Sequence, residues 1–324
     1  MKILLIGGTN FIGPAVTEQL TLSEHEVVLF HRNIASNIQY RQIQGDCNNI
    51  DDIGKALETT EPDVIIHTIA LCRNQINILE QALQGKKRRV VILSSIDVYK
   101  AYEVFFGLSD ASVVPVPFDE QAELRDVLYP YRGKLDADFA YDYEKILVEH
   151  AALQSPVVDV IILRLGMVYG QNDPNRRFSE PIQKMYQNVK QIELSKNTAD
   201  FRSCKCYVKD IAYGIKLAAE SNIRNEIYNL AALETWTELE WYQEIAKLMD
   251  WHGDIVVTQD NSTPNNNTNP KQHLIADTTK IRKQLNYKEI FSIREGLNDT
   301  IQWELDTLEK ESYQVVLQDQ KKEN

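Results

Sequence analysis

The chain has 324 residues, of which 43% are hydrophobic, and its formal net charge is −12. This length and apolar content allow a substantial core in one large domain or two coupled ones, which excludes a disordered or fibrous protein. The negative charge disfavours long contacts with nucleic-acid phosphates or anionic membranes. Nucleic acid is therefore not expected as a partner.

The four cysteines, Cys47, Cys72, Cys204 and Cys206, are too few and too scattered for a disulfide scaffold. No signal peptide precedes the first apolar run, so we expect a reducing, cytoplasmic setting. Cys204 and Cys206 lack the further ligands of a tetrahedral site and are spaced for one face of a strand, so no metal is expected. No apolar run approaches the roughly 20 residues that span a membrane.

Short apolar runs rich in Val, Ile and Leu alternate with amphipathic segments in the first half of the chain. Runs of this kind, with little polar alternation, are typical of parallel strands covered by helices on both faces. The sequence therefore predicts an α/β fold with a doubly wound parallel sheet, whose strands include Ile3–Ile6, Val27–Phe30, Val64–His67, Val90–Leu93 and Val160–Leu163.

The second half is less regular. Its pattern predicts a helix over Tyr207–Glu220, an apolar strand over Glu226–Leu230, and a helix that Thr237 opens with Glu240 as a capping box. The stretch 261–270 consists only of Asn, Ser, Thr and Pro, so it is predicted to be a surface loop.

Residues 7–13, Gly-Gly-Thr-Asn-Phe-Ile-Gly, follow the first predicted strand and open a helix. Backbone N–H groups and the positive end of that helix can converge there on a diphosphate. An ordinary strand-to-helix turn is the alternative, but the N-terminal strand favours a pyrophosphate site for NAD or NADP. The loop residues expected to bind the cofactor are Gly7, Thr9, Asn10, Phe11, Ile12 and Gly13.

The middle glycine of such loops is absent, and Asn10 replaces it. Because Asn tolerates a positive φ better than most residues, we expect Asn10 to hold the turn. Pro14 suits the first turn of a helix that begins near Phe11.

His31 and Arg32 follow the second predicted strand. About 20 residues past the glycines, an acidic residue binds the ribose of NAD, whereas a basic residue meets the 2′-phosphate of NADP. We therefore expect NADP rather than NAD, the alternative being that Arg32 is a solvated loop charge.

Tyr141 and Lys145 are one helical turn apart, so on a helix they would share a face. A lysine ammonium beside a phenol lowers the tyrosine pKa from about 10 toward working pH, so that the phenol can exchange a proton with an alcohol or carbonyl. Ser95, after the strand Val90–Leu93, is expected to donate a hydrogen bond to the reacting oxygen. Surface residues on an amphipathic helix and a strand-capping serine are the alternatives.

These motifs resemble the extended short-chain dehydrogenase/reductase superfamily, in its NAD-dependent epimerase/dehydratase group, over nearly the whole chain. The matching segments keep the family's order and are residues 7–13, Gly45-Asp46, 64–70, 94–99, Tyr141 with Lys145, 163–170 and 207–210. A later segment, residues 277–287 with Gly296 and Trp303, is similar to the family's C-terminal signature.

The resemblance implies a Rossmann domain over residues 1–170, rejoined by the strand near 226–230, and a smaller interleaved α/β lobe, mainly substrate-binding, over 171–324. It also implies that Asp46 approaches the adenine and that Ser95, Tyr141 and Lys145 form a catalytic triad. The other expected cofactor contacts are Cys47, Thr68, Ile69, Ala70, Tyr141 and Lys145.

Asp97 matches an acidic residue with which dehydratases and decarboxylases of this family move protons, although Ile96 breaks the dehydratase's acidic pair; a brace for the loop is the alternative. Arg202 resembles an arginine that meets a substrate phosphate, with a structural salt bridge as the alternative. Met167 completes the expected substrate contacts.

Residues 101–140 lengthen the interval between Ser95 and Tyr141, and Lys100 stands where the family usually has glycine. Long insertions are commonly lids or binding loops, and a surface excursion with its own small core is the alternative.

The resemblance implies an NAD(P)-dependent enzyme of oxidoreductase type that acts by hydride transfer at a carbinol carbon, in the manner of a nucleotide-sugar epimerase or dehydratase, with Tyr141 as base. A nucleotide-sugar substrate and a homodimer are family expectations. The alternatives are an NADPH-dependent reductase of a small carbonyl compound and a non-catalytic NADP sensor or RNA-associated scaffold.

Overall fold

The computed structural model describes residues 1–34, 39–259 and 268–322 of the chain. The loop predicted over 261–270 therefore lies largely outside the described residues.

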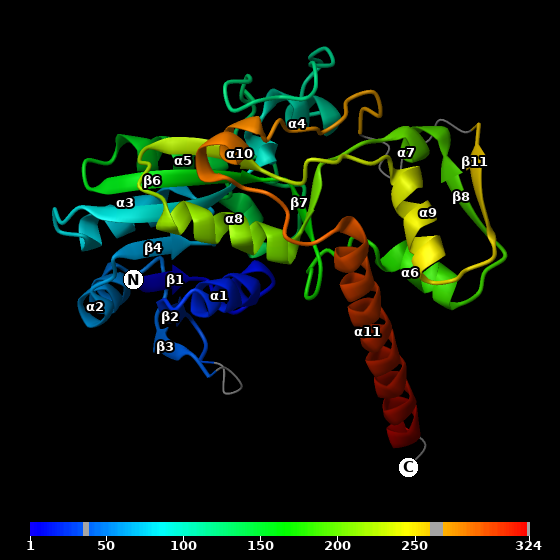
Figure 1. The fold of residues 1–324 in the computed structure, drawn as a ribbon, viewed down its shortest axis with the longest axis horizontal. Helices are drawn as coiled ribbons and strands as arrows, with labels where there is room; N and C mark the ends of the chain where they lie inside the picture. Colours follow the sequence, from blue (N-terminus) through cyan, green and yellow to red (C-terminus); the bar gives the residue numbers. More distant parts are fainter. Residues whose placement is uncertain (35–38, 260–267, 323–324) are drawn as a thin grey trace.

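A seven-stranded parallel sheet forms the centre of the fold, in the order β10-β6-β5-β4-β1-β2-β3 (Figure 1). The doubly wound α/β architecture predicted from the apolar runs is confirmed. The strands are β1 (Lys2–Ile6), β2 (Glu26–His31), β3 (Arg41–Gln44), β4 (Val64–His67), β5 (Arg88–Ser95), β6 (Val158–Leu165) and β10 (Glu226–Leu230).

Alternate residues of β1 enter two separate cores, which is why its apolar run is unbroken. Ile3 and Leu5 belong to one core, and Leu4 and Ile6 belong to the other. Helices cover both faces, because each face must be removed from water. Helices α1 (Ile12–Leu22) and α8 (Val208–Glu220) cover the first core, and α2 (Ile50–Thr60), α3 (Arg73–Ala82) and α5 (Lys145–Gln154) cover the second.

A smaller lobe lies to the right of the sheet in Figure 1. It contains two two-stranded parallel sheets, β8 with β11 and β7 with β9. Its elements are β7 (Met167–Tyr169), α6 (Ser179–Tyr186), β8 (Gln191–Ser195), α7 (Lys196–Asp200), β9 (Lys205–Tyr207), α9 (Glu238–Leu248), β11 (Asp254–Thr258) and α11 (Ile293–Lys322), which extends away from the body.

Two local predictions for the second half are confirmed. Helix α8 closely matches the predicted span, and α9 begins after Thr237, which forms a reciprocal capping box with Glu240. Helix α10 (Thr279–Leu285) returns to the main sheet, where Lys280 pairs with Glu226 of β10 at 2.6 Å. Several late elements thus pack on the first sheet, and a domain boundary at residue 170 stays a prediction.

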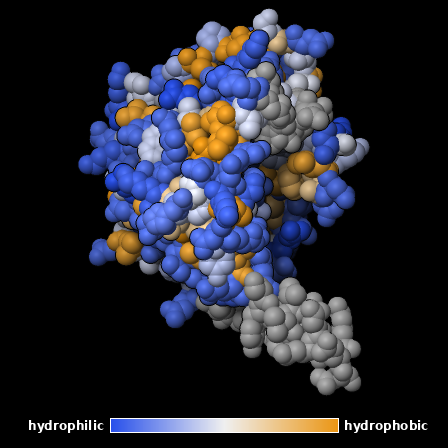
Figure 2. All heavy atoms as spheres, turned by 90° about the vertical axis from the view of Figure 1, so that its right-hand side faces the viewer, coloured by the Kyte–Doolittle hydropathy of each residue, from blue (hydrophilic) through white to orange (hydrophobic). Residues whose placement is uncertain are grey.

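On the face of the smaller lobe, hydrophilic side chains surround separate small groups of hydrophobic ones (Figure 2). Within the described ranges, no helix has both the length and the apolar character needed to cross a membrane. The same residues contain no cluster of His, Cys, Asp and Glu that could hold a metal ion. Cys204 and Cys206 are buried, on either side of Lys205 at the start of β9.

The insertion after β5 is held by a buried carboxylate. It runs through the 3-10 turn η1 (Ile96–Val98), helix α4 (Lys100–Phe105) and the 3-10 turn η2 (Asp138–Tyr141). Glu103 accepts hydrogen bonds from Lys100, from Ser109 and from the backbone N–H groups of residues 126 and 127. Burial raises the pKa of Glu103, but these bonds outweigh it and bring the pKa to about 2.

A second buried ion pair joins the sheet to α5. Arg164 of β6 donates to both carboxylate oxygens of Glu149, at 2.7 Å for Nη2 to Oε2, and Ser94 of β5 donates to Oε1. Both charged side chains are almost completely buried. Their mutual pairing is what makes the burial of each charge tolerable.

Glu149→Ala is predicted to lower the free energy of unfolding by about 3–5 kcal/mol, because it leaves the Arg164 guanidinium buried without its partner. Glu180→Ala is the matched control, since Glu180 pairs with Lys184 at the surface, where such pairs contribute roughly 0.2–1 kcal/mol. Urea unfolding of both variants measures the difference. Equal losses would contradict the role given to the buried pair.

Candidate active site

A cleft of about 810 Å³ lies at the carboxyl ends of the central strands. Its walls are the segments that follow β1, β2, β3 and β4, joined by Asp138, Phe139 and Asp142. Of the predicted cofactor residues, it is lined by Gly7, Thr9, Asn10, Phe11, Ile12, His31, Arg32, Asp46, Cys47, Thr68 and Ile69. Those outside its lining are Gly13, Ala70, Tyr141 and Lys145.

The glycine loop reverses direction at a different residue from the one predicted. Gly7 has φ +91°, and a Cβ there would lie 2.4 Å from Thr68 Oγ1, so this position requires glycine. Phe11, not Asn10, takes the positive φ, at 45°. The prediction for Asn10 was wrong because the chain turns at the N-cap of α1, where Gly13 N–H donates to the Asn10 carbonyl at 2.9 Å.

The cleft has the features that a dinucleotide requires. Helix α1 begins at Ile12, as predicted, with neither a side-chain cap nor an acidic residue in its first turn, so its N–H groups face an anionic ligand without competition. His31 Nε2, in the cleft wall, is buried and has no hydrogen-bond partner among the described residues. These polar groups fit the phosphates and riboses of NAD or NADP.

Lys145 is buried between the carboxyl ends of two central strands. Its ammonium donates to the carbonyl oxygens of Ala70, after β4, and Leu93, in β5, at 2.7 and 2.8 Å. Burial lowers its pKa to about 8, so the group is mostly charged at neutral pH. Burial, together with Lys145, lowers the pKa of His67 to about 3 and keeps that imidazole neutral.

Tyr141 does not share a helical face with Lys145. Helix α5 begins only at Lys145, because the side chain of Glu144 caps it by accepting the N–H of Ile146, and Tyr141 ends the separate turn η2. Tyr141 is 65% exposed, with the guanidinium of Arg132 4.3 Å from its ring centre. The predicted helical geometry was therefore wrong, and the role of Tyr141 as base stays a prediction.

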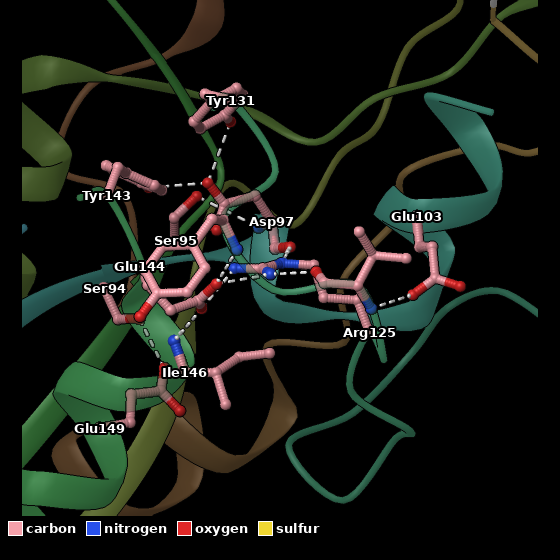
Figure 3. Close-up of polar contacts among 12 residues, drawn as sticks. Ser94, Ser95, Asp97, Glu103, Arg125, Tyr131, Tyr143, Glu144, Ile146 and Glu149 are labelled. Carbon is pink, nitrogen blue, oxygen red and sulfur yellow. Dashed lines mark hydrogen bonds and ion pairs between the residues drawn. The ribbon is translucent and has the colours of Figure 1, made fainter. Parts of the chain in front are cut away.

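Tyr143 takes the position beside Ser95 and Lys145 that was expected for Tyr141. It is 8% exposed, its ring centre lies 5.7 Å from Lys145 Nζ, and its hydroxyl donates to Asp97 Oδ2 at 2.7 Å (Figure 3). Ser95 contacts the same residue, because it caps η1 and its Oγ accepts the Asp97 N–H at 3.1 Å. The sequence feature that could have indicated Tyr143 is the second tyrosine in the segment Tyr-Asp-Tyr-Glu-Lys.

Arg125, in the insertion, binds the residues around Tyr143, and the sequence motifs did not indicate it. Its guanidinium binds both oxygens of Glu144, at 2.6 and 2.9 Å, and its Nε donates to the backbone carbonyl of Asp97 at 2.9 Å (Figure 3). Pairing of planar guanidinium and carboxylate groups fixes orientation as well as distance. The insertion therefore helps to position the segment that carries Tyr143.

The three expected substrate residues have different surroundings. Asp97 is 2% exposed and belongs to the cluster with Tyr143. Met167 begins β7 and packs on the core beneath the insertion. Arg202 is exposed, lies beside His273, and forms no ion pair with another described residue, so the structural salt bridge is not observed.

Gly13→Ala is predicted to weaken dinucleotide binding and to destabilise the fold by about 1–3 kcal/mol, because the added Cβ would lie 2.4 Å from the Gly8 carbonyl carbon and separate α1 from the loop. Gly54→Ala on α2 is the control, since its Cβ would meet nothing within 4 Å. Calorimetric titration with NAD and NADP and urea unfolding measure both effects. Unchanged binding by the Gly13 variant would argue against the cleft as the cofactor site.

Comparison with known proteins relates this fold and cleft to a family. The model of the NAD dependent epimerase/dehydratase family matches residues 3–231. The UDP-N-acetyl-alpha-D-glucosaminuronate decarboxylase of Bacillus cytotoxicus is 23% identical, over 93% of this chain and 97% of that protein.

Two solved structures share the fold over almost their whole length. The UDP-glucose 4-epimerase of Thermotoga maritima with UDP-glucose has a TM-score of 0.69 at 16% identity, covering 95% of this chain and 100% of that chain. The Thermus thermophilus UDP-glucose 4-epimerase in complex with NAD has a TM-score of 0.65 at 16% identity, covering 94% and 99%. Since the family model spans more than half of the chain, the protein belongs to the NAD dependent epimerase/dehydratase family of enzymes, as its motifs predicted.

Proposed function

We propose that this protein binds a nucleotide sugar and oxidises one of its carbinol carbons by hydride transfer, as a step of an epimerase, dehydratase or decarboxylase reaction. The observation that carries the proposal is the buried ammonium of Lys145, held by the carbonyls of Ala70, after β4, and Leu93, in β5, close to a cleft fit for a dinucleotide. The names of the relatives, a UDP-sugar decarboxylase and UDP-glucose epimerases, support the substrate class.

The chain's own groups have distinct roles in this proposal. The segments after β1 to β4 hold the cofactor, which when bound supplies a hydride acceptor and donor. Lys145 uses two of its N–H bonds on backbone carbonyls and keeps the third for a ribose or substrate oxygen. Ser95 donates to the reacting oxygen, and the family pattern assigns the base to Tyr141.

The end of β2 supports NADP rather than NAD. His31 and Arg32 line the cleft there, and Gln44 donates to the Arg32 carbonyl at 2.9 Å, which steadies its backbone. The guanidinium suits the two negative charges of a 2′-phosphate better than a neutral ribose hydroxyl.

The function is tested with UDP-glucose, UDP-glucuronic acid and UDP-N-acetylglucosaminuronic acid, each deuterated on the sugar ring. We expect deuterium to appear on the bound dinucleotide and a rearranged sugar to be released, with Lys145→Met slower by about 10²-fold or more because the charge beside the reacting oxygen is lost. Mass spectrometry follows both species. Stoichiometric oxidation of NADPH by a small carbonyl compound, without sugar turnover, would instead identify a reductase.

Arg32→Ser is predicted to weaken NADP binding by about 10- to 100-fold, because a charged hydrogen bond contributes roughly 1.5–3 kcal/mol, with little change for NAD. Arg41→Ser is the charge-matched control, since Arg41 is half-exposed on β3 and faces Glu26. Parallel titrations with both dinucleotides give the two ratios. Tighter binding of NAD than NADP by the wild-type protein would remove the preference.

A further inference from the structure

Asp97 is a buried carboxylate that two phenols bind at one oxygen. Tyr143 donates to Oδ2 at 2.7 Å and Tyr131 donates to the same atom at 3.0 Å (Figure 3). Oδ1 is buried and lacks a hydrogen-bond partner within the described part of the chain. A carboxylate that is unsolvated on one side is disfavoured in its charged form, which makes it ready to accept a proton.

The insertion fixes the phenols around this carboxylate. The hydroxyls of Tyr102 and Tyr131 are 2.7 Å apart, and because Tyr131 donates to Asp97, Tyr102 is the donor between them. The Tyr131 ring packs edge-on against Tyr143, with ring centres 5.0 Å apart. The Tyr143 hydroxyl is therefore held in place by ring packing and by Asp97.

Tyr143 also lies where a proton must be exchanged in the proposed reaction. It lies near Lys145 and shares Asp97 with Ser95 as a hydrogen-bond partner, whereas the exposed Tyr141 packs on Arg132. A group that exchanges a proton must be within hydrogen-bond reach of the oxygen that Ser95 also contacts. Of the two tyrosines before Lys145, Tyr143 meets this requirement without a rearrangement of η2.

We infer that Asp97 and Tyr143 form the proton-exchanging pair of this site, an inference that rests on the proposed hydride transfer. A dinucleotide bound in the cleft in its oxidised form would accept the hydride, with its electron pair, from the substrate C–H bond, and the substrate hydroxyl proton would pass to Tyr143 Oη. The proton of Tyr143 passes at the same time to Asp97 Oδ2. The alcohol becomes a carbonyl, Tyr143 stays neutral and Asp97 becomes a neutral acid; reduction of the carbonyl reverses each transfer.

The charges around the pair agree with these roles. Burial raises the pKa of Asp97, while hydrogen bonds from Tyr143 and Tyr131 and the charges of Arg125 and Lys145 oppose the rise. Burial and the Asp97 charge raise the pKa of Tyr143 well above its usual value, so this phenol passes a proton on rather than waiting as a phenolate. Since the base is the carboxylate, oxidation slows as the pH falls through the raised pKa of Asp97.

Infrared spectroscopy tests the pair without turnover. As the pH of the wild-type protein is lowered, the infrared spectrum should gain the C=O stretching band of protonated Asp97. The Asp97→Asn variant should lack this band. Tyr143→Phe deletes a bond that stabilises the carboxylate, so the midpoint of this band should move to higher pH, and Tyr131→Phe should move it in the same direction. Tyr186→Phe, at the exposed end of α6, is the control and leaves the midpoint unchanged.

Deuterium transfer from the labelled sugar tests the pair in turnover. Tyr143→Phe and Asp97→Asn should each slow the transfer by about 10²-fold or more, the scale of a lost acid–base group, while still binding the dinucleotide. The loss in Tyr143→Phe should exceed the loss in Tyr141→Phe by a similar factor. In the wild-type protein, the rate of deuterium transfer should fall as the pH is lowered through the infrared midpoint.

Two results would overturn the pair: an Asp97 midpoint that Tyr143→Phe does not move, or a loss in Tyr141→Phe as large as that in Tyr143→Phe. The proposed function fails separately. A protein that transfers no deuterium from any of the sugars, but shows an Asp97 band that responds to Tyr143→Phe, loses the proposed function and the role of the pair in turnover, and keeps only the coupled protonation of Asp97 and Tyr143.

Discussion

The candidate site depends on the buried ion pair between Arg125 and Glu144, whose side chains are 0% and 1% exposed. Charges at this depth must stay paired, since removal of one partner from such a pair typically costs about 3–5 kcal/mol. The Glu144 carboxylate also caps α5, so it fixes the start of this helix at Lys145. In addition, it accepts a hydrogen bond from the backbone N–H of Tyr129 in the insertion. Through Arg125 Nε the pair also holds the backbone of Asp97. One interaction thus aligns three segments that are distant in the chain.

The fold was predictable because its strongest signals are local and repeated. Strands buried on both faces are mostly apolar, so their positions could be read from the apolar runs. The polar edge strand β3, Arg-Gln-Ile-Gln, carries no such signal and was missed. The glycine loop was recognised from its context, but which residue takes the positive φ depends on where α1 begins. The tolerance of Asn for a positive φ therefore assigned that role to Asn10 instead of Phe11.

The site was predictable only in part, because spacing converts to distance only within a continuous helix. Tyr141 and Lys145 have helical spacing, but the Glu144 cap starts the helix at Lys145 and leaves Tyr143 in the centre. Tyr131 reaches Asp97 from 34 residues away, and no periodicity in residues 101–140 signals that contact. The insertion has packed core contacts, and its role as a lid or binding loop stays a prediction.

The short turn η2 and the residue after it connect the dinucleotide cleft to the cluster of Asp97 and Tyr143. Phe139 and Asp142 line the cleft, and Tyr143, the next residue, binds Asp97. A dinucleotide that contacts Phe139 and Asp142 therefore influences the backbone conformation of the segment that orients the Tyr143 side chain. By thermodynamic reciprocity, any preference of the cofactor for the aligned phenol strengthens its own binding by the same free energy. Such a link would make catalytic alignment a consequence of cofactor loading and favour a binding order in which the dinucleotide precedes the substrate.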